Sequence, residues 1–429
     1  MQHKADYWDP ELETMPPEKL RELQEERLCA LVNRVYQKVP FYQKKLNEAR
    51  IKPEDIKGLA DLPRLPVTEY LEDFVATPLE EKLAVPWELI TDILSTSGTL
   101  SGFTQPVPFT SQDLDTAMNL GARSVRMAGV REEDTIQLLI PFDLFVLALK
   151  KVASKVIPSI AGRMMLDNQI KLAKVAGATV ILIVPSYLLR FCERAKELGI
   201  DLKNDTRLRT AIGAGEPLSA PVRNRIEAES GIRYYDLYGS SEGALIGGDC
   251  SQRDGLHIWA DHYLLEIIDP DSLKPLSPGE EGELVITTLT KEAMPLIRYR
   301  TGDVTRLLPN GHCSCGRTHP KIAPIRGRVD HIIKVQGVNL LPSDIEDFIV
   351  GTTELGTEFR IIVDRKGALQ QLKIEVELAP GVSHTQTLKQ KLEAAFEQAT
   401  SLKSEIELVP PGALPQTQFK AQRIVKNYE

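Results

Sequence analysis

The middle of the chain alternates short apolar runs with helix-like segments, and this alternation limits the fold more than any other feature. The apolar runs cover residues 135–141, 179–187 and 207–218. One helix-like segment lies at 167–178, and another ends near Leu198. Strands and helices that alternate in this way form mainly parallel sheets covered by helices, whose ligands bind in loops beyond the strand ends. We therefore predict an α/β fold.

The rest of the chain adds segments of a different character. A helix with one buried face is predicted over residues 17–39, where apolar residues recur at helical spacing. After Cys250 the sequence becomes β-rich, with strand-like runs at 264–270 and 282–289. Beyond Asp330 we expect a small α+β domain with strands at residues 359–363, 372–378 and 405–409 and a helix between the last two. In this region Ser343 is placed to cap a helix that begins at Asp344.

Length and charge exclude several classes of protein. At 429 residues the chain exceeds what one hydrophobic core usually supports, so we expect two domains. Sixty acidic against 52 basic residues give a net charge of -8, which argues against a nucleic-acid partner. The N-terminus lacks the pattern of a signal peptide, and the apolar stretch 138–149 is short and broken by Pro141 and Asp143. We predict a soluble, cytoplasmic protein without a membrane partner.

Short polar strings mark the expected ligand site. YGSSEG at 238–243, YRTGDV at 299–304 and RGRVD at 326–330 each place a charged side chain close to a glycine. Glycine lets the backbone approach a ligand, and the charged side chain can then hold hydroxyls or phosphates. The serine-, threonine- and glycine-rich segment 94–104 offers hydroxyls and amides that suit phosphates.

In this order, and with Lys420 near the C-terminus, the strings resemble those of the adenylate-forming enzymes. The chain looks most like the phenylacetate-CoA ligase family, and this likeness runs through its first seventy residues. Two positions differ from the family pattern. No lysine closes the phosphate loop after Phe103, and Phe419 replaces the glycine that usually precedes the lysine, although Arg423 matches.

The resemblance implies a large AMP-binding domain at 1–329 and a small mobile cap domain at 330–429, with the hinge at Asp330. It implies Glu242 as a catalytic residue and the magnesium ligand, and Lys420 as the catalytic lysine that neutralises charge on the α-phosphate.

The resemblance also implies the residues that bind the nucleotide. They are Ser95, Thr96, Ser97, Gly98 and Thr99 in the phosphate loop, Gly213, Ala214, Gly215 and Glu216 in the loop beside adenine, and Asp236, Leu237, Tyr238, Gly239, Ser240, Ser241, Asp303 and Arg328. Among these, Tyr238 would stack on the base, and Asp303 would hold the ribose hydroxyls. Arg300, beside Asp303, is expected to pair locally.

Cysteines and histidines form a second constellation. The ligand set of a closed structural zinc site is offered by Cys250, His257, Cys313 and Cys315. Rival ligands are His262, His312 and His319, and free thiols in a loop are the alternative. Some members of the family carry a zinc of this kind.

The preferred function is an acid-CoA ligase that uses ATP, Mg²⁺ and coenzyme A, with an aromatic carboxylic acid as substrate. Phe142 and Phe145 are candidates for an apolar pocket, and equally for the core. One alternative keeps the adenylation but changes the acceptor, to a deazaflavin coenzyme, an amine or a carrier protein. Another is a catalytically weak relative that binds a nucleotide or acyl ligand. A homodimer is the oligomeric state to test first.

Overall fold

The computed structural model describes residues 6–95, 104–140, 143–153, 155–309, 313–335, 338–366, 369–415 and 423–426. The chain forms two compact units, each built from separate stretches of sequence. Unit 1 comprises Met1–Glu132, Asp143–Ser154 and Tyr235–Ala323, and unit 2 comprises Glu133–Phe142, Lys155–Tyr234 and Pro324–Glu429.

Proline or a capping side chain starts most of the longer helices, as their sequences favour. The α-helices are α1 (Pro10–Glu13), α2 (Pro17–Lys38), α3 (Pro40–Glu48), α4 (Leu79–Lys82), α5 (Ser111–Met127), α6 (Asp143–Val152), α7 (Leu166–Val175), α8 (Pro185–Glu197), α9 (Leu202–Asp205), α10 (Ala220–Ser230), α11 (Pro342–Val350) and α12 (Gln386–Thr400). Among the described residues, no helix combines the length and the apolar composition that crossing a bilayer requires.

Helix α2 confirms the helix predicted near the N-terminus. Its buried residues are Leu20, Leu28, Leu31, Val32 and Val35. Most of this face packs in a cluster with Leu264, Leu289 and Ile297, which come from much later in the chain. The helix ends at Lys38 because Val39 precedes a proline and is therefore held in the extended conformation, at φ -115° and ψ 100°.

Antiparallel strands in unit 1 carry several of the predicted site residues. One sheet contains β10 (Tyr263–Ile268), β11 (Glu281–Thr288) and β12 (Tyr299–Arg306). Another set of neighbours is β7 (Arg233–Ser240), β8 (Ala244–Asp249), β9 (Leu256–Ile258) and β13 (Lys321–Ile322), and β1 (Ile90–Ser95) pairs with β2 (Pro106–Thr110). The β-rich character predicted after Cys250 is confirmed.

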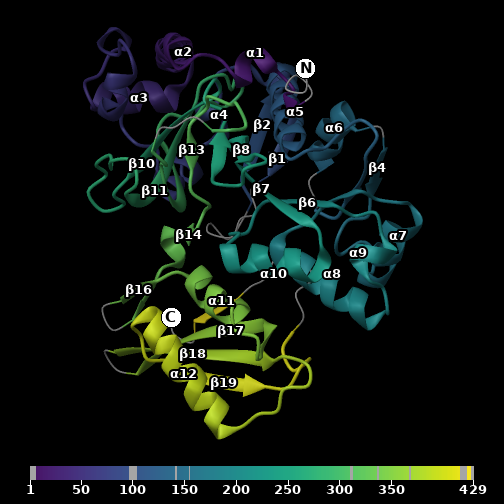
Figure 1. The fold of residues 1–429 in the computed structure, drawn as a ribbon. Coiled ribbons are helices and arrows are strands. Elements are labelled where there is room, and N and C mark those ends of the chain that lie inside the picture. Colours follow the sequence, from purple (N-terminus) through teal and green to yellow (C-terminus); the bar gives the residue numbers. More distant parts are fainter. Residues whose placement is uncertain are drawn as a thin grey trace. The chain divides into compact units, whose positions relative to one another are not determined.

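Four strands of unit 2 form the predicted parallel sheet. In spatial order they are β6 (Thr210–Gly213), β5 (Val180–Leu182), β3 (Thr135–Leu138) and β4 (Lys155–Pro158), and every pair is parallel. All residues of β3, β5 and β6 are buried, as expected when both faces of a sheet are covered. Helix α8 packs against α7 and α10 beside these strands (Figure 1). The α/β fold class is therefore confirmed.

The C-terminal part of unit 2 has a hydrophobic core of its own. Its sheet has the order β19 (Glu405–Val409), β18 (Leu369–Leu378), β17 (Leu355–Lys366) and β20 (Ile424–Lys426), and a separate pair is β15 (Ile333–Val335) with β16 (Val338–Leu340). Helices α11 and α12 lie alongside the larger sheet (Figure 1), and buried residues between Ile333 and Leu408 form one cluster. The three predicted strands are confirmed.

The predicted start of helix α11 is wrong. The helix begins at Pro342, and its N-cap position is Leu341. Proline suits the first helical position because its missing N–H needs no partner there. Ser343, the predicted cap, instead donates its hydroxyl to the carbonyl oxygen of Arg326.

A buried ion pair fastens the N-terminal segment of unit 1 to the cysteine loop, defined here as residues 313–319. Arg317 Nε donates to Glu13 Oε2 at 2.8 Å, and the two side chains are only 3% and 0% exposed. Nearby, the Tyr7 hydroxyl donates to the carbonyl oxygen of Cys315 at 2.7 Å. Two charges that leave water together need close contact, so this pair fixes how the segment lies.

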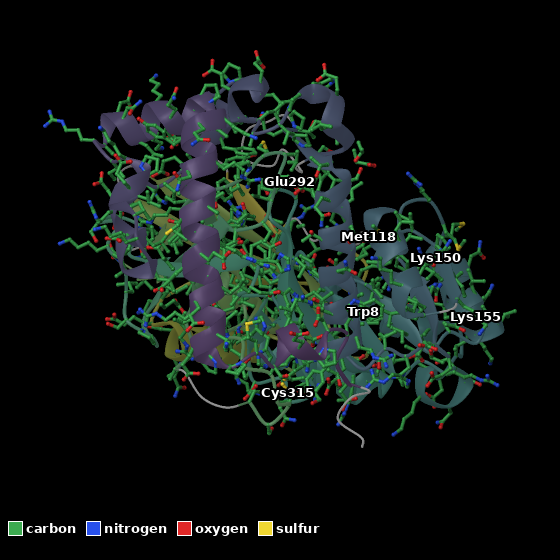
Figure 2. All side chains as sticks on the ribbon, turned by 90° about the horizontal axis from the view of Figure 1, so that it is seen from above. Trp8, Met118, Lys150, Lys155, Glu292 and Cys315 are labelled. Carbon is green, nitrogen blue, oxygen red and sulfur yellow. The ribbon has the colours of Figure 1, made fainter. Side chains whose placement is uncertain are left out.

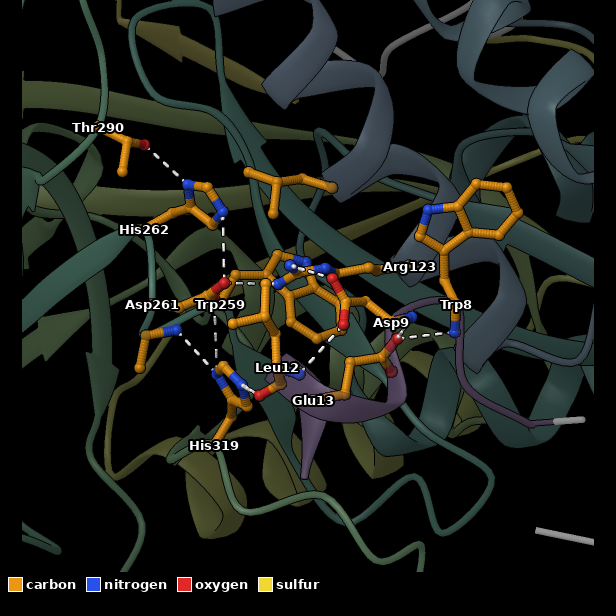
Figure 3. A network of polar contacts seen from close by, with 12 residues as sticks. Trp8, Asp9, Leu12, Glu13, Arg123, Trp259, Asp261, His262, Thr290 and His319 are labelled. Atoms are coloured by element: carbon orange, nitrogen blue, oxygen red, sulfur yellow. Dashed lines mark hydrogen bonds and ion pairs between the residues drawn. The ribbon is translucent and has the colours of Figure 1, made fainter. Parts of the chain in front are cut away.

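A second buried carboxylate lies beside the first ion pair. Figure 3 shows Asp261, which is fully buried and accepts from Arg123 Nη1 at 2.8 Å. His262 Nε2 lies 3.3 Å from the same carboxylate, and Arg123 also contacts Asp9 at 3.5 Å. The N-terminal segment is therefore tied to α5 as well as to the cysteine loop.

We expect Glu13→Gln to lower the free energy of unfolding by about 3–5 kcal/mol, because the amide leaves the buried Arg317 guanidinium without a counter-charge. Denaturant-induced unfolding followed by tryptophan fluorescence measures the change. The matched variant is Glu11→Gln, since Glu11 lies exposed in the same short helix. We expect that variant to stay within about 0.5 kcal/mol of the parent. Equal effects of the two changes would contradict a stabilising role for the ion pair.

Candidate active site and metal cluster

The turn between β7 and β8 holds Glu242, the predicted magnesium ligand. The Gly243 amide donates to Ser240 Oγ at 2.9 Å, and Ala244 adopts the left-handed conformation with φ 61°. The Glu242 side chain is only 8% exposed, and its Oε1 accepts from the Tyr299 hydroxyl at 3.1 Å. The first residue of β12 therefore orients the carboxylate at this turn.

Strand β12 also contacts strand β7 itself. The Tyr238 hydroxyl donates to Asp303 Oδ2 at 2.7 Å, and the Asp303 amide donates to Thr301 Oγ1 at 3.0 Å. Asp236, two residues before Tyr238, is buried, and its amide donates to Asp249 Oδ2 at 2.9 Å. The structure thus brings together the predicted strings at 238–243 and 299–304. Leu237 and Gly239 lie on the same strand, β7.

Arg300 pairs locally, as predicted. Its guanidinium donates to Glu69 Oε1 at 2.8 Å and to Glu283 Oε2 at 2.5 Å. Burial lowers the pKa of Arg300, but these two carboxylates raise it more, so the net shift is upward. The two ion pairs of Arg300 therefore hold β12 against Glu69 and Glu283.

The predicted phosphate loop begins beside the same turn. Ser95 ends β1, and its carbonyl oxygen accepts from Ser241 Oγ at 3.1 Å. The predicted residues Thr96, Ser97, Gly98 and Thr99 lie outside the described residues, and so do Lys420, Phe142, His312 and the side chain of Phe145. The contact therefore joins the described start of the loop to the turn that carries Glu242.

In unit 2 the predicted loop Gly213, Ala214, Gly215 and Glu216 follows β6. A Cβ added to Gly213 would lie 1.7 Å from the Tyr234 hydroxyl, so only glycine fits at the strand end. Gly215 has φ 88°, a conformation that also favours glycine. Glu216 accepts from the amide and the hydroxyl of Ser186, at 3.0 and 2.8 Å, at the start of α8. This fixes the loop against a helix N-terminus, where a carboxylate is stabilised.

The predicted hinge and its neighbours also lie in unit 2. Arg328 Nε donates to Asp330 Oδ1 at 2.9 Å. Arg423 pairs with Glu358 at 2.7 Å and lies 4.2 Å from the centre of the Phe359 ring. Arg423, three residues after Lys420, is thus anchored to the sheet of the C-terminal part.

The four predicted zinc ligands gather at one point of unit 1. Their ligand atoms all lie within 4.8 Å of one another. The sulfurs of Cys250 and Cys313 are 3.6 Å apart, and Cys315 Sγ lies 3.4 Å from His257 Nε2. Around a tetrahedral zinc with bonds of about 2.3 Å, two sulfurs lie roughly 3.8 Å apart. Cys315, which is partly exposed, lies near the edge of the molecule as Figure 2 shows it. The cluster therefore fits a zinc ion.

The backbone fixes the ring of His257 for this role. Its Nδ1 lies 3.0 Å from the carbonyl oxygen of His319. A carbonyl can only accept, so Nδ1 carries a proton, and Nε2, which faces Cys315, is the nitrogen that would lose its proton to bind a metal. Burial lowers the pKa of His257, but Cys313 and Cys315 raise it to about 9. The hydrogen bond from Cys250, aided by His257, lowers the pKa of the Cys315 thiol, which favours the metal-binding thiolate.

The described rival histidines have other partners. His319 Nδ1 accepts from the Ala260 amide at 2.9 Å, and its Nε2 lies 2.9 Å from the carbonyl oxygen of Leu12 (Figure 3). His262 Nδ1 lies 2.7 Å from Thr290 Oγ1, while its Nε2 faces Asp261. Both nitrogens of each rival are engaged within the buried network.

Sequence reasoning missed Lys291, which contacts the backbone of Glu242. Its ammonium donates to the carbonyl oxygen of Glu242, and the residue is only 8% exposed. A cavity of about 20 Å³, enough for one water molecule, lies beside it and is also lined by Asp113 and His262. Only its place in the sequence could have drawn attention to Lys291. It lies between the predicted strand at 282–289 and the string YRTGDV at 299–304.

Two family models match the sequence. "AMP-binding enzyme" matches residues 143–290, and "AMP-binding enzyme C-terminal domain" matches residues 337–427. Phenylacetate-coenzyme A ligase from Thermus thermophilus is 35% identical, over 96% of this chain and 97% of that enzyme. The enzyme of the same name from Escherichia coli is 34% identical, over 97% of this chain and 96% of that enzyme.

A solved structure is similar along the whole chain. It is 2-hydroxyisobutyryl-CoA ligase in the postadenylation state, in complex with R3-HIB-AMP, at 26% identity and a TM-score of 0.90. The match covers 100% of this chain and 94% of that chain.

We expect Gly213→Ala to lower the free energy of unfolding by at least about 1–3 kcal/mol, the usual cost of overpacking a buried site. The new methyl would also lie 2.4 Å from the carbonyl oxygen of Ile183, so β6 has to move. Ala214→Gly, which removes a methyl at the next position, should cost at most about 1 kcal/mol. Thermal unfolding compares the two variants. An unchanged melting temperature for Gly213→Ala would contradict the steric argument.

Proposed function

The chain belongs to the phenylacetate-CoA ligase family of AMP-binding enzymes, and we therefore propose that it joins an aromatic, phenylacetate-like acid to CoA at the expense of ATP. A carboxylate oxygen attacks the α-phosphorus of ATP, the bond to the β-phosphate breaks, and pyrophosphate leaves. The CoA thiol then attacks the acyl carbon of the adenylate, AMP leaves, and the thiol proton passes to solvent. Both steps require mainly positioning and electrostatic stabilisation.

The observation that carries the proposal is that β12 contacts both β7 and the turn that follows β7. Tyr238 with Asp303, and Glu242 with Tyr299, lie at the two ends of this contact. In the proposed site Tyr238 and Asp236 bind the base, Asp303 holds the ribose hydroxyls, and Glu242 holds Mg²⁺. The metal, when bound, would offset negative charge on the phosphates.

The remaining roles follow the family pattern. We assign the phosphates to the loop that starts at Ser95 and to Arg328, and the adenine to Gly213–Glu216. Lys420 is proposed to neutralise the charge that develops on the α-phosphate. The cap domain would begin at Asp330, which is supported by the separate core of the residues beyond it. The cytoplasmic location and the homodimer stay predictions.

We further propose that Cys250, His257, Cys313 and Cys315 hold a structural zinc ion. Three of the four residues are buried, and the set leaves no open coordination position. The metal would then stabilise the cysteine loop, to which the N-terminal segment is fastened, and would take no part in the reaction.

Lys420→Ala should lower the rate of acid-dependent ATP–pyrophosphate exchange about 10²–10³-fold, because it removes a charge aimed at the transition state. A panel of acids that includes phenylacetate is scored for exchange, and then for thioester and AMP after CoA is added. The control is Lys403→Ala, an exposed lysine of the C-terminal part, which should exchange like the parent. If CoA changes neither the product nor the rate of AMP formation, the ligase proposal fails.

Protein purified without added metal should contain about one equivalent of zinc, and Cys313→Ser should reduce this content. Elemental analysis measures the metal, and thermal unfolding measures its effect on stability. Cys29→Ser is the control, since Cys29 is only half-buried and lies outside the cluster. Zinc-free protein with the same melting temperature as the metal-loaded form would contradict the proposal.

A further inference from the structure

Lys291 is a buried cation with no assigned role in the reaction. Its Nζ lies 4.5 Å from the centre of the Phe109 ring and donates to the carbonyl oxygen of Glu242 at 2.5 Å. Burial lowers its pKa to about 8, against the opposing effects of Asp113 and Glu242. The Nζ donor of this buried side chain therefore binds the backbone of the proposed magnesium ligand.

The next carbonyl of the turn, that of Gly243, also accepts a hydrogen bond from a buried side chain. The Tyr263 hydroxyl donates to the Gly243 carbonyl oxygen at 2.5 Å, and Tyr263 is buried. Ala244 then takes a left-handed conformation that costs a non-glycine residue free energy. Two donors, Lys291 and Tyr263, thus hold successive peptide groups, while Tyr299 binds the Glu242 carboxylate.

Lys291 is itself held firmly in place. The amides of the next two residues, Glu292 and Ala293, donate to the Asp113 carboxylate at 2.6 and 2.9 Å. Asp113 belongs to the capping box that starts α5, and Glu292 is labelled near that helix in Figure 2. Arg34 binds the Lys291 carbonyl oxygen at 2.5 Å. The segment that carries Lys291 is therefore anchored by Asp113 and by Arg34, and this holds the ammonium against the turn.

We propose that Lys291 is a positioning residue that sets the backbone of Glu242 so that its carboxylate can hold Mg²⁺. The inference rests on the proposed function, because that function makes Glu242 the magnesium ligand. A buried carbonyl that loses its donor must find another partner, so the peptide group at Glu242 would reorient. The carboxylate on the same residue would move with it. Loss of such a supporting contact typically lowers metal affinity about 10–100-fold.

The experiment measures acid-dependent ATP–pyrophosphate exchange of the full chain as Mg²⁺ is varied at saturating ATP and acid. Lys291→Met should raise the Mg²⁺ concentration for half-maximal exchange about 10–100-fold and leave the KM for the acid unchanged. Lys291→Arg keeps the charge and the donors, and should restore part of the Mg²⁺ affinity.

Lys82→Met is the matched control. Lys82 is also buried, donates to a backbone carbonyl, that of Phe74, and lies 4.4 Å from the centre of the Phe74 ring. Burial lowers its pKa to about 8 as well, but its carbonyl partner lies outside the turn of Glu242. We expect a similar fall in melting temperature and an unchanged Mg²⁺ dependence.

Two outcomes separate this inference from the proposed function. A wild-type chain that exchanges, together with a Lys291→Met variant of unchanged Mg²⁺ dependence, overturns the inference alone. If the wild-type chain shows no exchange above background with any acid of the panel, the proposed function is overturned, and the inference with it. If Lys291→Met does not fold, Tyr263→Phe decides, since it removes only the donor to the neighbouring carbonyl. That variant should also raise the Mg²⁺ requirement, and a wild-type Mg²⁺ dependence would then overturn the inference.

Discussion

The contact between strand β12 and the end of strand β7 is the interaction on which the candidate site depends. These strands belong to different sheets, so no ladder of backbone hydrogen bonds sets their relative position. Two tyrosine hydroxyls do so instead, one from Tyr299 to Glu242 and one from Tyr238 to Asp303. Each phenol lies in the core and directs its polar end at a carboxylate, which a buried tyrosine requires. The spacing of the acidic groups is therefore set by packing between sheets.

Around this contact, unit 1 buries several charges and pairs each of them. Arg317 meets Glu13, Arg123 meets Asp261, and Lys291 meets a carbonyl and an aromatic face. Such groups lose favourable hydration, so they persist only where geometry supplies partners. These buried pairs raise the free energy of any alternative packing of the same segments, and the site therefore has a defined shape.

Much of the fold could be predicted from the sequence because its signals are local. The apolar runs of the parallel strands, the apolar face of α2 and the three C-terminal strands all reflect hydrophobic periodicity. The grouping of the four proposed zinc ligands followed from side-chain chemistry. Lys291 could not be found in this way, because a lysine in a sequence is normally solvent-exposed and its burial depends on Phe109 and Asp113, far away in the chain. The start of α11 was missed because Pro342 opens the helix one residue before Ser343, whose hydroxyl donates to the carbonyl oxygen of Arg326 and does not act as the N-cap acceptor.

The ion pair between Glu13 and Arg317 also has a consequence for biosynthesis. The two residues are separated by 304 positions, so the segment around Glu13 leaves the ribosome long before its partner is made. At ordinary rates of translation this interval lasts roughly 15–60 s. During that time the buried carboxylate and its apolar neighbours have no native contacts with the cysteine loop. The earliest-made part of unit 1 is thus among the last to reach its final place, and it is exposed to chaperones and proteases while the chain grows.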